Sequence, residues 1–367
     1  MIFKKMASEF LFVLPPGTMG DQKPLAILAV YAAYAMFLIQ SKIQITIVCF
    51  ENMTWMKTIE RFALQLIGKQ FIQWLQIEHG ELDEVRMKNA IVFTVQHTYN
   101  ESCRDQQILL DFGDNASLNR FTSVLLSGYR SKSNCFGSLY LPIERNQIQW
   151  ADELAKKELS TFRNKHKNQK CLVIAGSLRP PFELSAILHW IESNVTEDWV
   201  ILLLGYNDII HFGKFTTRMK QNKNKIHAMK HSIPYEDVVA VADFFVSNCG
   251  AGSVVTSLAA SCPQLCRHRG TVGIDKPFNQ DIIGNQLKVG PFDPREQLSF
   301  GDLMNLLQTD YDFYLKHAIY YQAILQQELL QMQENLIRFF TDLRKKRFQQ
   351  QLQKSNLIPK KYALKQL

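Results

Sequence analysis

Apolar runs alternate with polar segments along the first hundred residues in the pattern of a strand, a helix and a second strand. Residues 10–14 form a short apolar run that ends at Pro15-Pro16-Gly17, and residues 24–41 form a longer apolar segment of helical length. Residues 42–50 follow, with an Ile-Gln-Ile-Thr-Ile-Val centre between polar ends, and β-branched residues favour strands. This order of elements predicts a parallel α/β domain.

The alternation continues to about residue 112, and a second series begins at residue 170 after a polar stretch. Further strands are expected at residues 90–95, 108–112, 171–175, 199–204, 226–229, 244–247 and 264–267, and helices at 55–75, 150–162, 183–193, 235–242 and 251–260. From residue 300 the pattern is wholly helical. We therefore expect two similar α/β domains, residues 1–150 and 151–320, followed by a helix and basic tail over residues 321–367.

Length and composition agree with a folded two-domain protein. The chain has 367 residues, 46% of them hydrophobic, and its 24 Phe exclude a disordered chain. The apolar segment at residues 25–39 is shorter than the roughly 20 residues that span a bilayer, so we interpret it as a core helix. Acidic and proline residues interrupt residues 1–16, and we expect no signal peptide there.

Charge and cysteine content narrow the class of partner. The net charge is +8, but nine Lys or Arg against three Asp or Glu lie beyond residue 325, so no nucleic-acid partner is expected. The basic tail leaves a peripheral contact with an anionic membrane open. Seven cysteines without paired CxxC spacing indicate a reducing, cytoplasmic location, and we expect neither a metal site nor a cofactor.

A glycine-containing loop is expected between the first strand and the first helix. It contains Gly17, Thr18, Gly20 and Asp21, at the carboxyl end of a strand, where open α/β sheets place their ligands. The glycines permit tight turns, and Asp21 lies near the start of the helix. The alternative, favoured by position alone, is that Asp21 only caps that helix.

A second loop follows the strand at residues 244–247. Its residues Asn248, Gly250, Ala251, Gly252 and Ser253 are small or polar and precede a helix. Small residues let backbone N–H groups and the positive helix end approach a phosphate, and the Ser253 hydroxyl adds a donor. A tight strand-to-helix turn without a ligand is an equally good interpretation of this loop alone.

Two further loops belong to the same series. Gly176 and Ser177 end the first strand of the second domain and would face the same crevice. Asp275 and Lys276 follow the last strand, where Asp275 could accept hydrogen bonds from sugar hydroxyls and Lys276 could offset phosphate charge. As isolated residues, Asp275 and Lys276 are more often a solvated pair.

Taken together, these loops resemble the family 1 nucleotide-sugar glycosyltransferases, the branch that includes sterol and antibiotic glycosyltransferases. The resemblance rests on Gly-Thr-Met-Gly-Asp-Gln-Lys-Pro-Leu at residues 17–25 and on four stretches in the second half, at residues 175–177, 233–235, 250–253 and 259–264, with Asp-Lys-Pro-Phe-Asn at 275–279. It implies the GT-B fold, two Rossmann-like domains that face a central cleft.

By this resemblance, the chain is an inverting hexosyltransferase. The amino-terminal domain would bind a small or lipophilic acceptor, and Asp21 would act as the general base on its hydroxyl. The carboxyl-terminal domain would bind the donor, a UDP-sugar or similar compound, with the diphosphate on the amides of residues 250–253 and the sugar near Asp275. No metal would be required.

Two departures from the family pattern support a rival hypothesis. Asn248 stands where the family usually has a His before the glycine run, and an amide cannot carry that positive charge. Lys276 stands where the family usually has Gln. A non-catalytic nucleotide-sugar binder, serving as an interaction module, is therefore the alternative function.

Overall fold

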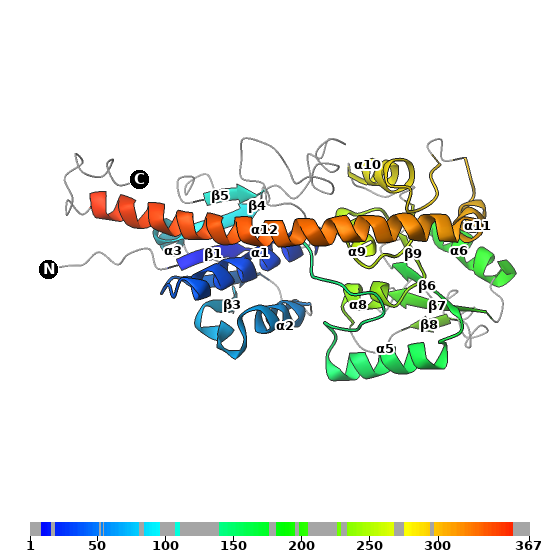
Figure 1. Ribbon diagram of the computed structural model, residues 1–367, viewed down its shortest axis with the longest axis horizontal. Coiled ribbons are helices and arrows are strands. Elements are labelled where there is room, and N and C mark those ends of the chain that lie inside the picture. The colour runs from blue at the N-terminus through cyan, green and yellow to red at the C-terminus, as the bar shows by residue number, and fades with distance from the viewer. Residues whose placement is uncertain are drawn as a thin grey trace. The chain divides into compact units, whose positions relative to one another are not determined.

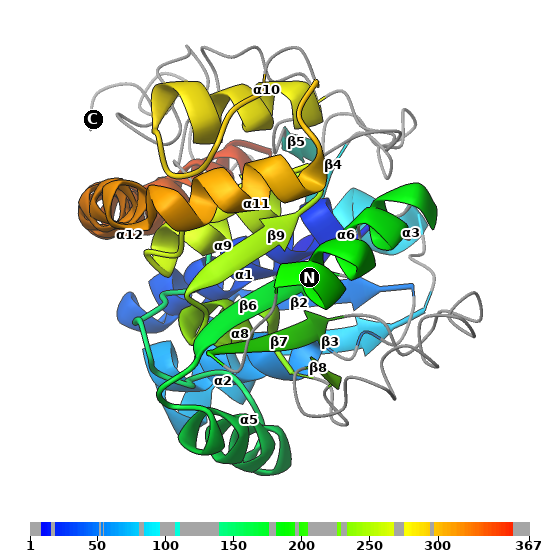
Figure 2. The same cartoon turned by 90° about the vertical axis from the view of Figure 1, so that its right-hand side faces the viewer.

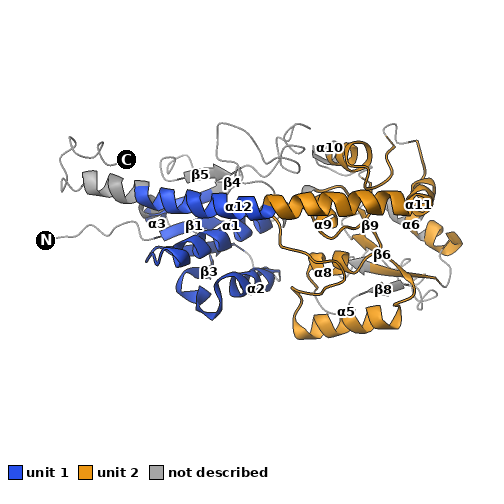
Figure 3. Cartoon of the chain, in the orientation of Figure 1, with its two compact units in different colours: residues 1–112, 329–367 blue, residues 113–328 orange. Residues whose placement is uncertain are grey.

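The computed structural model of the chain divides into two compact units. Unit 1 contains residues 1–112 and 329–367, and unit 2 contains residues 113–328 (Figure 3). The structure describes residues 9–15, 19–50, 53, 55–80, 84–95, 107–110, 139–175, 181–194, 198–204, 226–228, 233–267, 275–293 and 297–354.

Unit 1 is built on a five-stranded parallel sheet with strand order β3-β2-β1-β4-β5. The strands are β1 (Glu9–Val13), β2 (Gln44–Cys49), β3 (Leu75–His79), β4 (Ile91–Val95) and β5 (Gln107–Leu110). The helices are α1 (Met19–Leu38), α2 (Met56–Ile67) and α3 (Glu84–Asn89), with a short 3-10 helix, η1 (Lys69–Gln73), before β3 (Figure 1).

Apolar residues on both faces explain why β1 lies at the centre of this sheet. Phe10 to Val13 are all buried, as expected of a parallel strand covered on two sides. The Phe12 ring stacks on Phe93 with centroids 4.4 Å apart, and Phe340 packs edge-on against Phe93 at 5.6 Å. Helix α1 is buried around most of its circumference, so the apolar segment at residues 25–39 forms core, as the sequence predicts.

The helix expected at residues 55–75 is too long by about two turns. Helix α2 ends at Ile67 because Gly68 adopts a left-handed φ of 83° and returns its N–H to the Leu64 carbonyl. Strand β3 follows, and the sequence did not predict it. Its Leu-Gln-Ile-Glu-His sequence is largely polar, and only Leu75 is fully buried, since β3 lies at the edge of the sheet.

Unit 2 repeats the same strand order around its own first strand. Its parallel sheet runs β10-β9-β6-β7-β8, and Figure 2 shows β9, β6, β7 and β8 side by side. The strands are β6 (Lys170–Ala175), β7 (Trp199–Leu204), β8 (Ile226–Ala228), β9 (Phe244–Ser247) and β10 (Gln264–Cys266). The two-domain α/β prediction is confirmed in the two sheets.

The helices of unit 2 connect and cover these strands. They are α5 (Glu153–Lys165), α6 (Pro181–Asn194), α8 (Tyr235–Ala240), α9 (Ala251–Ala259), α10 (Asp275–Asp281), with a π-helical turn η5 (Ile282–Gln286), and α11 (Phe300–Thr309). A core of Trp190, Trp199, Phe244 and Phe300 lies between the sheet, α6 and α11. Within the described ranges, no helix is both long and apolar enough to cross a membrane.

The units divide the chain differently from the expected boundaries at residues 150 and 320. Residues 139–150 belong to unit 2, where the buried Asp237 carboxylate accepts hydrogen bonds from the backbone N–H groups of Gln149, Trp150 and Ala151. Burial raises the pKa of Asp237 to about 6, and these N–H groups lower it by less. Helix α12 (Tyr311–Lys354) is continuous, with its first part in unit 2 and its part from Leu329 in unit 1.

Candidate functional site

The strand order places one candidate ligand crevice in each unit. Neighbouring strands β6 and β9 lead into helices α6 and α9, and the sheet continues outward from each of them in opposite directions. Ligands of open α/β sheets bind at such switch points, outside the carboxyl ends of the strands. The loop after β9 is described, whereas Gly176 and Ser177, after β6, lie outside the described residues.

No side chain in the described part of the chain caps the amino terminus of α9. Its N-cap residue is Gly250, and Ala251, Gly252 and Ser253 form the first turn, which contains no acidic residue. Gly252 is exposed, and a Cβ added to it would meet nothing within 4 Å. The first N–H groups of α9 and the positive end of its dipole therefore remain available to an anion.

A left-handed residue sets the path of the chain into this helix. Cys249 is buried with φ 64°, a conformation that is costly for a side chain with a Cβ. Its N–H donates to Ser247 Oγ at 3.2 Å, and its carbonyl accepts from Asn279 Nδ2 at 2.6 Å. Asn248 Oδ1 accepts from the Gly250 N–H at 3.4 Å, so this side chain also holds the loop.

A buried chain of hydrogen bonds supports the loop from below. Ser257 Oγ donates to Gln264 Oε1 at 2.5 Å, and Gln264 Nε2 donates to Ser247 Oγ at 2.5 Å. All three side chains are buried, and Gln264 is 0% exposed. We call Ser247, Ser257 and Gln264 the polar chain. Buried polar groups that are mutually satisfied fix one arrangement, so the polar chain determines where Cys249 and the α9 terminus lie.

Sequence reasoning did not select the polar chain or Asn279 as site residues. The available signal was a polar residue, Gln264, in a short strand among apolar neighbours, and an Asn one helical turn after Asp275. Asp275 and Lys276 are the first two residues of α10, and Asn279 joins the same helix to the Cys249 carbonyl. The structure thus joins α10 to the loop after β9 through Asn279.

Tyr235 is the first residue of α8 and lies close to Ser253, in the first turn of α9. Its ring packs edge-on against Phe245 at 5.3 Å, and its Oη is buried with no hydrogen-bond partner among the described residues. Burial raises the pKa of the Tyr235 phenol well above its usual value, and the neighbouring Ser253 hydroxyl lowers it by less.

The corresponding crevice of unit 1 lies at the carboxyl ends of β1 and β4. Gly20 and Asp21 fall in the first turn of α1, while Gly17 and Thr18 lie outside the described residues. Gln22 is only 5% exposed, and its Nε2 donates to the Pro15 carbonyl at 2.6 Å. This bond joins the end of the β1 segment to the first turn of α1, where Gln22 directly follows Asp21.

Comparisons with solved structures reveal the fold. No protein-family model matches the sequence, and no curated protein matches it. TcCGT1 in complex with UDP superposes with a TM-score of 0.63 at 10% identity, covering 92% of this chain and 99% of that one. UGT71G1 of Medicago truncatula complexed with UDP-glucose gives 0.54 at 12% identity, covering 91% and 98%.

A third solved structure is also similar to this chain. The glycotransferase of kitacinnamycin has a TM-score of 0.54 at 11% identity, covering 92% of this chain and 98% of its own. At these identities the likeness concerns the fold. The chain has the GT-B fold, and the resemblance to family 1 glycosyltransferases that the loops predicted is confirmed at the level of structure.

Proposed function

We propose that the chain is an inverting glycosyltransferase that moves a hexose from a nucleoside diphosphate sugar, preferably a UDP-sugar, to a hydroxyl of a small or lipophilic acceptor. The observation that carries the proposal is the uncapped α9 terminus, held open at a switch point by the polar chain. The neighbours of similar fold were crystallised with UDP or UDP-glucose, which supports this choice of donor.

In the proposed mechanism, unit 2 stabilises the leaving group. As the bond between the sugar and the diphosphate breaks, negative charge grows on the phosphate oxygens, and the N–H groups of residues 251–253 donate to it. The α9 dipole adds a fixed positive potential, so no metal ion is required. Asn248, Gly176 and Ser177 would bind the same diphosphate, and Asp275 with Lys276 would orient the sugar.

Unit 1 would supply the acceptor side of the reaction. Asp21, with Gly17, Thr18 and Gly20 in its loop, would accept the proton of the acceptor hydroxyl while that oxygen attacks the anomeric carbon from the face opposite the diphosphate. Attack from that face inverts the configuration. The acceptor-binding role of residues 1–150 and the donor-binding role of residues 151–320 are part of this proposal, as is a cytoplasmic location with peripheral membrane contact through the tail.

A turnover assay with purified protein tests the chemistry. UDP-glucose and other UDP-hexoses are supplied with hydroxyl-bearing acceptors, and UDP release is measured. Asp21→Asn should lower kcat by about 10³-fold or more while UDP affinity stays within twofold, because the base does not bind the donor. Glu60→Gln, an exposed carboxylate of α2, is the matched control. No UDP release with any donor would reject the enzymatic proposal.

Gly252→Ala tests the diphosphate position separately. The added Cβ has open space in the free protein, so stability should be unchanged or slightly higher. If the diphosphate lies against this turn, the methyl group prevents its approach, and UDP affinity should fall about tenfold or more. Unchanged UDP affinity in a folded Gly252→Ala protein would contradict the proposed cradle.

A non-catalytic nucleotide-sugar binder is the second candidate, favoured by Asn248 in place of the charged residue usual near the diphosphate. Isothermal titration calorimetry distinguishes the two. UDP binding that Gly252→Ala weakens, without any turnover, would support the binder. Absence of UDP binding would reject both candidates.

A further inference from the structure

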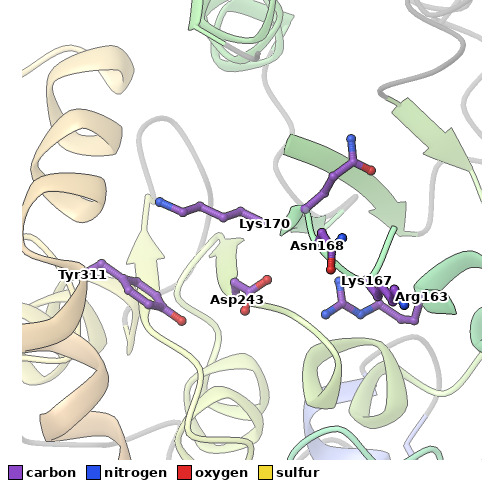
Figure 4. Close-up of a pocket in the computed structure, with 7 residues that line it drawn as sticks. Arg163, Lys167, Asn168, Lys170, Asp243 and Tyr311 are labelled. Carbon is purple, nitrogen blue, oxygen red and sulfur yellow. The ribbon is translucent and has the colours of Figure 1, made fainter. Parts of the chain in front are cut away.

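Unit 2 contains a pocket at the amino ends of its central strands, at the opposite end of the sheet from the amino terminus of α9. Its volume is about 280 Å³, and its lining includes Arg163, Lys167, Asn168, Lys170, Asp243 and Tyr311 (Figure 4). Lys170 is the first residue of β6, and Asp243 directly precedes β9. Because β6 has six residues, its amino end lies about 16 Å from its carboxyl end. The pocket is therefore separate from the proposed donor site.

Positive charge predominates in this pocket. Three cations line it, Arg163, Lys167 and Lys170, against the single carboxylate of Asp243. That carboxylate already has partners, since its Oδ2 accepts from the Cys171 N–H at 2.8 Å and its Oδ1 lies 3.8 Å from Arg145 Nη2. Asp243 is therefore shared with Arg145, and the lining keeps an excess of positive charge.

Arg163 lacks the counter-ion that a partly buried guanidinium usually has. Among the described residues, its buried Nη1 has no hydrogen-bond partner and the side chain forms no ion pair with a carboxylate, although it lies beside the Cys171 thiol. Lys170 Nζ lies 5.6 Å from the Trp199 ring centre, which compensates its charge only weakly. The carboxyl end of α5 attracts Arg163 through its dipole, but Lys167 and Lys170 lie beyond that helix.

We infer that this pocket binds a small phosphate dianion, either inorganic phosphate or the phosphate group of a small monoester. Donors suited to phosphate oxygens come from the Arg163 guanidinium, the Lys167 and Lys170 ammonium groups, the Asn168 amide and the Tyr311 hydroxyl. Figure 4 shows Asp243 between Tyr311 and Arg163, so donors approach the cavity from both sides. A volume near 280 Å³ accommodates a phosphate monoester but is small for a nucleotide sugar.

The test is calorimetric titration of the full-length protein with inorganic phosphate and with glycerol phosphate, at constant ionic strength in chloride. Binding should be saturable. Arg163→Gln should weaken it about tenfold, and Lys167→Gln, an exposed site, about threefold. Lys156→Gln removes an equal charge from an exposed position on α5 and should leave the affinity unchanged.

Each other result overturns the inference. Binding that does not saturate, or that Lys156→Gln weakens as much as Lys167→Gln, indicates general screening of a basic surface. Loss with Gly252→Ala but not with Lys167→Gln would place phosphate at α9. Binding only to phosphatidic acid vesicles, with neither free anion bound, would identify a membrane contact instead. If Arg163→Gln does not fold, the phosphate affinity of Lys167→Gln alone tests the inference. Because these titrations contain no sugar donor, a negative result does not bear on the proposed glycosyltransferase function.

Discussion

The two candidate ligand loops border corresponding crevices in two sheets of identical strand order, but they follow different strands, β1 in unit 1 and β9 in unit 2, and they are held in different ways. In unit 2, the loop after β9 has five hydrogen-bonding side chains on it or beneath it: Ser247, Asn248, Ser257, Gln264 and Asn279. In unit 1, the described tie between the β1 segment and the start of α1 is the single bond from Gln22 to the Pro15 carbonyl.

The difference matches the chemistry proposed for each loop. Backbone N–H groups stabilise a growing charge only if they are already oriented, because reorienting them during the reaction consumes the energy they would supply. A buried, satisfied network provides that rigidity. A single carboxylate that accepts a proton can instead adjust through its own side-chain torsions, so the segment around Asp21 needs only its backbone position fixed. Substitutions of the side chains that hold the loop should therefore reduce stability more in unit 2 than in unit 1.

The largest effect is expected from Gly290→Ala in unit 2. A Cβ at Gly290 would lie 1.7 Å from the Gln264 carbonyl oxygen and 2.8 Å from its carbonyl carbon, both of them backbone atoms. The clash must displace β10 and the polar chain, at a cost of about 3 kcal/mol or more in the free energy of unfolding. Denaturant unfolding measures it. Gly301→Ala, whose Cβ meets only ordinary contacts at 3.5 Å, is the control, and a loss below about 1 kcal/mol at Gly290 would contradict the argument.

Gln264→Ala should have the next largest effect. It removes both bonds of the polar chain and leaves the buried Ser247 and Ser257 hydroxyls short of a partner, at about 2–3 kcal/mol of unfolding free energy. Because Ser247 also holds the Cys249 N–H, UDP affinity should fall as well. Gln327→Ala, exposed on α12, should change neither quantity. If Gln264→Ala lost stability but kept full UDP affinity, the polar chain would support only the core.

Most of the fold follows from the sequence because buried parallel strands are continuous apolar runs. The runs at residues 171–175, 199–204 and 244–247 coincide with β6, β7 and β9 within one residue. Edge strand β3 was missed because half of its side chains face water, and the end of α2 depended on the backbone conformation of Gly68, which local periodicity does not reveal.

The candidate site could be predicted only as far as its loops. The glycine run at residues 250–253 identifies a phosphate-binding turn by composition, since few other residues permit such an approach. Two of the groups that hold the turn, Gln264 and Asn279, come from β10 and α10, more than ten residues further along the chain. Their side chains meet the loop only because β10 pairs with β9 and Asn279 donates to Cys249, which are tertiary contacts with no local signal.

Asn279→Ala should have an intermediate effect and separate donor binding from stability. Loss of the bond to the Cys249 carbonyl should cost about 1–2 kcal/mol, and it releases α10, which begins with Asp275, from the loop after β9. If Asp275 orients the sugar, the affinity for UDP-glucose should fall more than the affinity for UDP, which lacks the hexose. Calorimetry with both ligands measures the two losses. Equal losses would indicate that Asn279 positions the diphosphate turn alone.

The smallest stability effect is expected from Gln22→Ala in unit 1, at about 1 kcal/mol, because one buried hydrogen bond to Pro15 is lost and Ala suits a helix slightly better. Its functional signature should be the reverse of that of Asn279→Ala. UDP affinity should remain within twofold, whereas kcat should fall about tenfold, since the Asp21 backbone is no longer fixed against the end of the β1 segment. Gln73→Ala, exposed in η1, should alter neither kcat nor stability. A fall in UDP affinity without a fall in kcat would mean that the loop of unit 1 serves the donor, and the contrast between the two loops would no longer correspond to acceptor and donor roles.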